Sequence, residues 1–335
     1  MTYQVSLIIP AWNAENTISD CIISAIKAKK GPSEIIVVDD FSNDNTVYVV
    51  NNLANIYPII KLIKLKNNVG PSAARDFGVD ASSGDLIFFA DSDTILLDNT
   101  FANCIDTINR YKADAVSGIY HPEPINDGKT QLYKALFFYY HFVRHKKPFE
   151  YETFNGQIAA IKKKVYLETG GYNKEILWGM DNENEEFGRR IIKNHLLLVD
   201  PNFQVKHNFP GFKKLTSTYF FRVSTWMYVF MQDFKFESGG PAAMDSGIAA
   251  LSVPLMIFFL LLGLVLSKIF FIFFIIFVSI WLSGYLNFFI YVYKNKTSFL
   301  IHSILLNLWF SSVISFGAIW GIIKWLNGQR IKKKN

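Results

Sequence analysis

The sequence predicts an α/β domain with a mostly parallel sheet, followed by an α-helical membrane region. Up to about residue 212, short apolar runs alternate with stretches of helical periodicity, and charged residues are dispersed. This alternation is typical of βαβ units. Residues 247–323 differ sharply, because their only formal charges are Lys268, Lys294 and Lys296. A chain of 335 residues has room for both parts.

Four short apolar runs predict the strands of the first part: residues 5–9, 34–38, 59–65 and 86–90. Helices are predicted over residues 13–29, where Ile18, Ile22, Ile23 and Ile26 recur at helical spacing, and over residues 72–81. Strands separated in this way form a parallel sheet that binds ligands at the carboxyl ends of its strands. No G-x-G-x-x-G pattern follows the first strand, which argues against a dinucleotide-binding fold.

Polar residues stand at those carboxyl ends: Pro10 to Asn13, then Asp39-Asp40, then Asp91-Ser92-Asp93. The last group is the most informative. Side chains two apart on an extended segment point the same way, so both carboxylates can converge on one cation. A hard divalent ion held by one or two carboxylates suits a diphosphate ligand. The alternative is a strand that ends in a solvated acidic turn.

Three uncharged runs, residues 247–267, 269–293 and 299–323, are each long enough to cross a bilayer. Residues 213–238 come before them and predict an amphipathic helix at the membrane interface. Its aromatic and apolar side chains recur at helical spacing, with Lys213, Lys214 and Arg222 available for headgroups. We therefore expect a globular domain over residues 1–212, the interfacial helix, a membrane region over residues 247–323 and a basic tail over residues 324–335.

Much of the net charge of +6 lies beside the membrane segments, so it does not indicate nucleic-acid binding. Both the tail and Lys213-Lys214 predict cytoplasmic flanks by the positive-inside rule. Three crossings would place these flanks on opposite sides. Either one segment is re-entrant, or a long run holds another crossing, or the tail lies outside. Cys21 and Cys104 form no disulfide or metal pattern, which fits a cytoplasmic globular part on a multi-pass membrane protein.

Four motifs in the first hundred residues resemble those of family 2 glycosyltransferases with the GT-A fold. They are VSLIIPAWN at residues 5–13, IIVVDDFSNDNT at 35–46, NVGPSAAR at 68–75 and the Asp91-Ser92-Asp93 group. The resemblance implies a GT-A domain that transfers a sugar from a nucleoside-diphosphate donor with inversion at the anomeric carbon. It becomes looser between about residue 100 and residue 212.

The resemblance also implies roles for individual residues. The nucleotide-binding candidates are Pro10, Trp12, Glu15, Asp40, Arg75 and Asp91. Asp40, with Asp39 beside it, would accept from a base N–H group, and Arg75 would pair with the diphosphate. Asp91, Asp93 and His207 would hold Mg²⁺ or Mn²⁺, of which imidazole favours Mn²⁺. The alternatives are a helix-capping Asp40, an ordinary first-turn Glu15, a surface Arg75 paired with Asp76 or Asp80, and a surface His207.

Residues 178–190, WGMDNENEEFGRR, resemble the acidic segment that supplies the family's catalytic base. The match departs from the pattern, because Met180 stands where an acid is common and two extra residues precede Phe187. Asp181 and Glu183 are therefore both candidates, with Asp181 preferred because Trp178-Gly179 anchors that side. The alternative is that the acids occupy a first helical turn only because of the helix dipole.

Together these features imply a membrane-anchored, metal-dependent inverting hexosyltransferase. The expected donor is a UDP-sugar, and the expected acceptor is a hydroxyl of a lipid-linked saccharide or glycolipid at the cytoplasmic membrane face. One alternative is a polyprenyl-phosphate glycosyl synthase, whose ionised acceptor needs no base. A processive polysaccharide synthase is disfavoured, because the Gln-x-x-Arg-Trp motif of such enzymes is absent. An inactive membrane scaffold is disfavoured by the intact acidic motifs.

Overall fold

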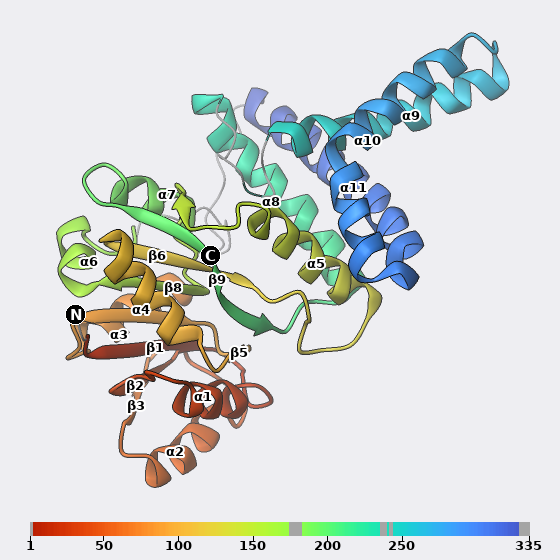
Figure 1. Ribbon diagram of the computed structural model, residues 1–335. Helices are drawn as coiled ribbons and strands as arrows, with labels where there is room; N and C mark the ends of the chain where they lie inside the picture. Colours follow the sequence, from red (N-terminus) through yellow and green to blue (C-terminus); the bar gives the residue numbers. More distant parts are fainter. Residues whose placement is uncertain (1–2, 174–182, 235–239, 241–243, 328–335) are drawn as a thin grey trace. The chain divides into compact units, whose positions relative to one another are not determined.

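The computed structural model describes residues 3–173, 183–234, 240 and 244–327 (Figure 1). The chain forms two compact units. We call Met1–Asn126 with Phe142–Asn208 the sheet unit, and Asp127–His141 with Phe209–Asn335 the helical unit. The boundary differs from the expected domain of residues 1–212 mainly because residues 127–141 lie with the later helices.

The described strands of the sheet unit form one sheet in the order β3-β2-β1-β4-β8-β6-β9-β5, with β7 also paired to β9. The strands are β1 (Val5–Ala11), β2 (Glu34–Asp39), β3 (Ile60–Lys64), β4 (Leu86–Ala90), β5 (Thr94–Leu96), β6 (Ala115–Tyr120), β7 (Phe149–Glu150), β8 (Ile158–Lys162) and β9 (Leu197–His207). The four predicted strands are confirmed as β1 to β4, with small shifts at their ends.

The sheet has a parallel half and a mixed half. Strands β3, β2, β1 and β4 are parallel, as the alternation of strands and helices predicted. Strand β8 is antiparallel to both β4 and β6, whereas β9 is parallel to β6. Short β5 then pairs antiparallel with the end of β9. The carboxyl end of β4 therefore lies in the same sheet as the end of β9, which comes more than a hundred residues later.

Helices pack against this sheet: α1 (Ile18–Lys27), α2 (Thr46–Ile56), α3 (Pro71–Asp80), α4 (Thr100–Tyr111), α6 (Lys163–Thr169) and α7 (Glu183–Ile191). The predicted helix 72–81 is confirmed as α3. Helix α1 begins later than the predicted residue 13, because the preceding segment is a loop. There Asn13 has a positive φ of 51°, and its backbone N–H donates to Ser42 Oγ at 2.9 Å.

The core of the sheet unit explains why α3 lies so close to the strands. Ile8, Val38 and Phe89 are fully buried in one apolar cluster. Gly78 on α3 sits directly over Ile8, where an added Cβ would collide with the Ile8 side chain. The close approach holds α3, which carries Arg75, against β1 and β2.

The helical unit contains α5 (Lys129–Val143), which belongs to it up to His141, and α8 (Phe212–Asp233), α9 (Met244–Val265), α10 (Phe270–Asn295) and α11 (Leu300–Leu326). Among the described residues, three helices are long and apolar enough to cross a membrane: Met244–Val265, Phe270–Asn295 and Thr297–Leu326. They correspond to the three predicted segments. Figure 1 shows α9 and α10 as a hairpin that extends beyond the other helices of this unit. On α5, Tyr133 and Phe137 are buried in the same cluster as Phe288 and Phe310, which explains why α5 lies here.

Candidate active site

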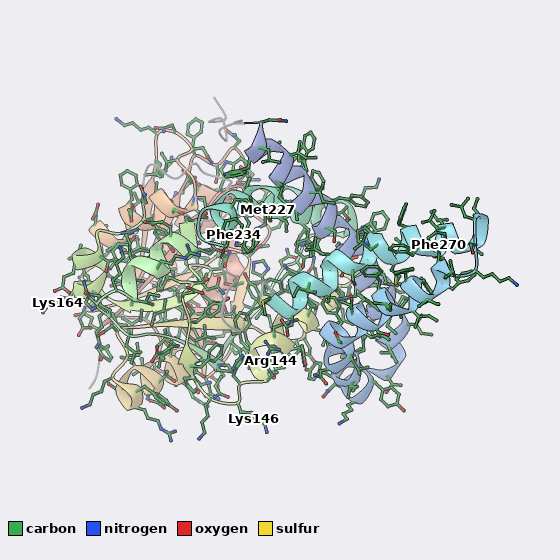
Figure 2. The ribbon with its side chains drawn as sticks, turned by 90° about the horizontal axis from the view of Figure 1, so that it is seen from above. Arg144, Lys146, Lys164, Met227, Phe234 and Phe270 are labelled. Atoms are coloured by element: carbon green, nitrogen blue, oxygen red, sulfur yellow. The ribbon has the colours of Figure 1, made fainter. Side chains whose placement is uncertain are left out.

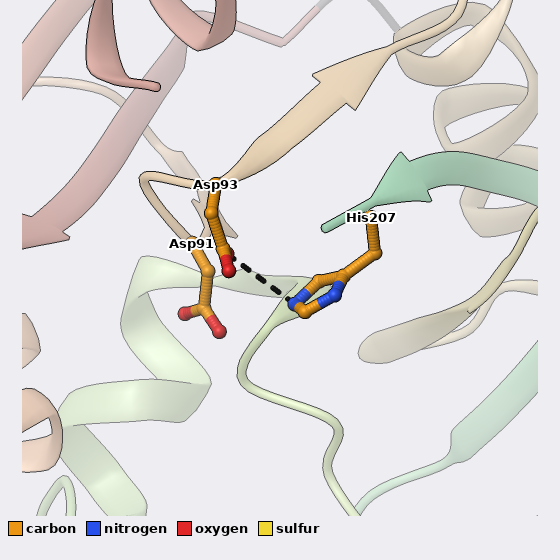
Figure 3. A group of neighbouring side chains, drawn as sticks. All are labelled: Asp91, Asp93 and His207. Atoms are coloured by element: carbon orange, nitrogen blue, oxygen red, sulfur yellow. Dashed lines mark ion pairs between the residues drawn. The ribbon is translucent and has the colours of Figure 1, made fainter. Parts of the chain in front are cut away.

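Strand pairing brings three candidate metal ligands together. In the β5–β9 pair, Thr94 lies opposite His207, so Asp93 stands beside the end of β9. The Asp93 Oδ1 atom lies 3.3 Å from His207 Nε2, and Asp91 approaches from the end of β4 (Figure 3). One ligand atom from each of Asp91, Asp93 and His207 lies within 4.8 Å of the others.

This donor set fits a divalent cation. An ion bound at about 2.0–2.2 Å keeps its ligand atoms within roughly 4.4 Å of one another, which needs only a small closure of the group. Two carboxylates with one imidazole suit Mn²⁺ better than Mg²⁺. The His207 ring is also held from the side by Tyr120, with ring centroids 4.7 Å apart. The three residues predicted as ligands therefore lie together in a geometry that could hold the metal.

Arg75 lies behind this group rather than at the surface. Its side chain is only 3% exposed, and Nη2 contacts Asp91 Oδ1 at 2.7 Å. The Tyr172 ring centroid lies 5.8 Å from the guanidinium carbon. Burial by itself lowers the pKa of Arg75, but Tyr172, Asp91 and Glu183 outweigh it and raise the pKa above its usual value. Arg75 thus orients Asp91, and its predicted contact with a diphosphate stays a prediction.

The start of α7 bonds to residues that pack around Arg75. Asn184 Oδ1 accepts hydrogen bonds from Gly156 N and Tyr172 Oη, each at 3.3 Å. An added Cβ on Gly156 would collide with Tyr172 Oη and lie 3.2 Å from the Arg75 guanidinium carbon. Glu183, one of the two candidate bases, is the first residue of α7. Asp181, the other candidate, lies outside the described residues, so the choice between them stays open.

Asp39 and Asp40, at the end of β2, differ in their surroundings. Asp40 is buried and accepts from the backbone N–H groups of Val69 at 2.7 Å and Gly70 at 2.9 Å. Burial raises the pKa of Asp40 in spite of these bonds. Asp39 is also buried, yet its Oδ1 atom has no hydrogen-bond partner among the described residues. Asp40 therefore holds the loop before α3, and its predicted contact with the nucleotide base stays a prediction.

Three other predicted nucleotide residues lie on or just after β1, the strand that pairs with β2. The β1 neighbour of Asp39 in the strand pairing is Ala11, which lies between Pro10 and Trp12. Pro10 is buried within β1, and the Trp12 side chain is about half exposed. Glu15 Oε2 accepts from both the backbone and the side-chain nitrogen of Asn45, so Glu15 joins the β1–α1 loop to the β2–α2 loop.

Comparison with known proteins identifies the domain. The family model for glycosyl transferase family 2 matches residues 6–170. Those residues form a family 2 glycosyltransferase domain. The fold agrees: a mannosyltransferase, PcManGT from Pyrobaculum calidifontis, solved with GDP-Man and Mn²⁺, superposes with a TM-score of 0.59 at 14% identity over 98% of this chain and 89% of its own. GalNAc-T7, solved with UDP, GalNAc and Mn²⁺, gives a TM-score of 0.52 at 19% identity, over 62% of this chain and 44% of its own. The sheet unit thus has the GT-A fold.

Curated relatives of the family 2 domain match it over part of their length. The UDP-Glc:alpha-D-GlcNAc-diphosphoundecaprenol beta-1,3-glucosyltransferase WfgD of Escherichia coli is 39% identical over 29% of this chain and 38% of its own. The GalNAc(5)-diNAcBac-PP-undecaprenol beta-1,3-glucosyltransferase of Campylobacter jejuni is 29% identical over 51% and 55%. The cholesterol galactosyltransferase of Borreliella burgdorferi is 34% identical over 33% and 30%. This chain therefore spans about half or less of the length of these relatives.

The packing around Gly156 makes a testable prediction. In Gly156→Ala, the new methyl group should push the Tyr172 and Arg75 side chains away from residue 156. This should lower the free energy of unfolding by about 1–3 kcal/mol and weaken Mn²⁺ binding through Asp91. Tyr172→Phe removes the hydroxyl that the new methyl would meet. The double variant should therefore recover part of the loss, as measured by thermal unfolding and Mn²⁺ calorimetry in detergent. Additive losses in the double variant would contradict this account of the contact.

Proposed function

We propose that this protein is a membrane-anchored, metal-dependent inverting glycosyltransferase that transfers a hexose from a UDP-sugar to a lipid-linked saccharide or glycolipid. The observation that carries the proposal is the Asp91, Asp93 and His207 group at the sheet edge of a family 2 domain. Carboxyl ends of strands in open α/β sheets are where such domains bind ligands. The basic flanks of the membrane segments support a cytoplasmic position for the domain.

Each side of the donor has residues suited to it. Asp39 Oδ1 offers an acceptor for the N3–H of uracil, and the exposed Trp12 ring could cover the base. Asp91, Asp93 and His207 would hold Mn²⁺ or Mg²⁺, which when bound supplies positive charge against the leaving diphosphate. Arg75 contacts the Asp91 carboxylate at 2.7 Å and would hold it in position before the donor arrives.

The acceptor side rests on α7 and the segment before it. A hydroxyl acceptor must lose a proton as it attacks the anomeric carbon, which calls for a carboxylate close to the donor sugar. The negative charge of Glu183 contributes to the raised pKa of Arg75, and Arg75 contacts Asp91, which supports a carboxylate on this side of the site. Asp181 is two residues earlier in the chain. Either carboxylate could serve as the base.

Lipid-linked acceptors are supported by two independent features. Two of the relatives named above act on undecaprenol-diphosphate-linked sugars, and a third on cholesterol. The chain itself carries three helices of membrane-crossing length and composition among its described residues. An acceptor held in the bilayer would meet the domain without leaving the membrane surface.

The metal assignment can be tested directly. Asp93→Asn and His207→Ala should each lower sugar transfer by about 10²–10³-fold, because charge on the leaving diphosphate would no longer be neutralised. Chelator should do the same to the unaltered protein, and added Mn²⁺ should reverse it. Transfer would be measured in lipid with a panel of nucleotide sugars. Asp106→Asn, an exposed carboxylate paired with Lys30, is the matched control and should keep full activity. Full turnover in chelator, with metal shown to be absent, would exclude the metal role.

Substitution of Asp39 and substitution of Asp40 should have different effects on nucleotide binding and on stability. Asp39→Asn should weaken UDP binding by about 10–100-fold, since a hydrogen bond to a charged group is worth roughly 1.5–3 kcal/mol. Asp40→Asn should lower thermal stability, because it loosens the Val69 and Gly70 loop. Calorimetry with free UDP and thermal unfolding of both variants would check this. If Asp40→Asn lowers UDP affinity and Asp39→Asn does not, the nucleotide role returns to Asp40.

The candidate bases distinguish a hydroxyl acceptor from a phosphate acceptor. Asp181→Asn and Glu183→Gln, made separately, should give one variant that is slower by about 10²–10⁴-fold and one that is mildly affected. Donor binding should stay near normal in both, which calorimetry would show. If both variants retain nearly full transfer at neutral pH, a polyprenyl-phosphate acceptor replaces the hydroxyl acceptor in the proposal.

A further inference from the structure

The α9–α10 hairpin of the helical unit has a free half. Near its base, Val253 and Trp281 belong to the buried cluster of the unit. Toward the tip, Phe259 packs across the hairpin, stacked on Phe273 at 5.0 Å and on Phe277 at 5.5 Å. Leu264 and Val265 there are 68% and 78% exposed. Figure 2 shows Phe270 at this free end, away from Met227 on α8. Apart from Ser267 and Lys268 at the turn, this end of the hairpin is apolar and largely exposed, which suits the bilayer core.

Helix α11 does not continue along this hairpin. It meets the hairpin near its base, where Trp281 Nε1 donates to Asn307 Oδ1 at 2.9 Å. Further along α11, Ser315 Oγ donates to the Ala250 carbonyl at 2.7 Å, in the second turn of α9. A third span packed beside α9 and α10 would be expected to contact them toward their tips as well. Among the described residues, the apolar cluster shared by these helices extends to about the middle of α9 and α10 and includes no residue of the half nearer their turn.

Instead, α8 lies along α11 in the same direction. Trp309 packs on Phe212, with ring centroids 5.4 Å apart. Eight residues further along both helices, an added Cβ at Gly317 would lie 2.7 Å from the Phe220 carbonyl oxygen. One turn later, a Cβ at Gly321 would lie 2.5 Å from the Ser224 carbonyl oxygen. The two glycines let the backbones approach closely, so α8 and α11 form one layer.

The first half of α11 is lined by α5. Asn307 Nδ2 donates to Tyr133 Oη at 3.1 Å, and Lys129 Nζ lies 2.6 Å from His302 Nε2. The chain runs from both ends of α5 directly into the sheet unit. Helix α5 therefore cannot be carried deep into a membrane while the sheet unit stays in water. Lys213 and Lys214, both exposed on α8, are equally unsuited to the bilayer core.

We propose that only the α9–α10 hairpin enters the bilayer core, and that α11 lies with α8 in the boundary between headgroups and acyl chains. The outer face of α11 is apolar and aromatic, with Ile301, Trp309, Phe316 and Trp320 all more than 40% exposed. Its opposite face carries buried Ser303, Asn307, Ser311 and Ser315. A helix that exposes tryptophans on one side and packs its opposite side on other helices fits the boundary region. Lys213, Lys214 and Lys324 can then meet anionic headgroups.

This arrangement removes the conflict between the two basic flanks. A hairpin returns the chain to the side from which it started, and a helix in the plane of the surface does not cross. Lys213-Lys214 and the tail after Leu326 then lie on one side, as the positive-inside rule requires. With three crossings they would lie on opposite sides.

Label depth distinguishes the two arrangements. Single cysteines would be placed on exposed positions of α10 (Ile272, Ile276, Leu286) and of α11 (Ile301, Phe316, Ile323) and spin-labelled. The native Cys21 and Cys104 are buried and need not be replaced. In liposomes, power saturation with oxygen and a water-soluble nickel chelate reports depth. We expect the α10 labels to pass through the bilayer core, while the α11 labels stay at one shallow depth. Depths on α11 that pass through the midplane would overturn the proposal.

The side of the C-terminus gives an independent check. Asn327→Cys at the end of α11 and Lys164→Cys in the sheet unit, whose side chain is 84% exposed, would be labelled with a membrane-impermeant maleimide in sealed vesicles of known orientation. We expect both to be labelled from the same side. Labelling from opposite sides means a third crossing and overturns the proposal. Neither readout depends on catalytic activity, so failure of the proposed reaction would leave the result intact.

Discussion

The buried ion pair between Arg75 and Asp91 is the interaction on which the rest of the site depends. A guanidinium withdrawn from water requires a negative partner, and breaking such a pair costs about 3–5 kcal/mol. Arg75 meets this requirement through a carboxylate that also belongs to the candidate metal group. Tyr172 and Gly156 enclose the guanidinium, and Asn184 ties both to the first turn of α7. The end of β4, helix α3 and the start of α7 are thereby held together around the Arg75 guanidinium.

The second constraint is the register between β5 and β9. A shift of one residue would turn His207 to the other face of the sheet and away from Asp93. Backbone bonds flank the group on both sides: Asp91 N donates to the Gln157 carbonyl at 3.2 Å, and Asn208 N donates to the Asp93 carbonyl at 3.1 Å. The turn that carries Asp91 and Asp93 is thus held between paired strands, and His207 is the last residue of β9.

Much of this arrangement could be predicted from local patterns. Strands β1 to β4 and helix α3 follow from apolar periodicity, and the metal group from acids placed at a strand end. The different surroundings of Asp39 and Asp40 could not be predicted, because Asp40 bonds to backbone N–H groups about thirty residues away at Val69 and Gly70. The burial of Arg75 was equally hidden, since only the folded contacts with Tyr172 and Gly156 exclude water from it. The packing of α5 was equally hidden, because the partners of its aromatic residues on α10 and α11 lie more than 140 residues further on.

Because α5 packs in the helical unit, the sheet unit cannot be produced alone by a single cut in the chain. Cutting the chain after Asn208 would remove α8 to α11 but leave α5, whose buried Tyr133, Leu136 and Phe137 would lose their apolar neighbours. Such a fragment would expose the apolar side chains of α5 to water and would tend to self-associate. A soluble version of the domain needs α5 replaced by a polar linker as well. The sheet unit and the helical unit are thus interleaved along the chain, so neither corresponds to one continuous segment of the sequence.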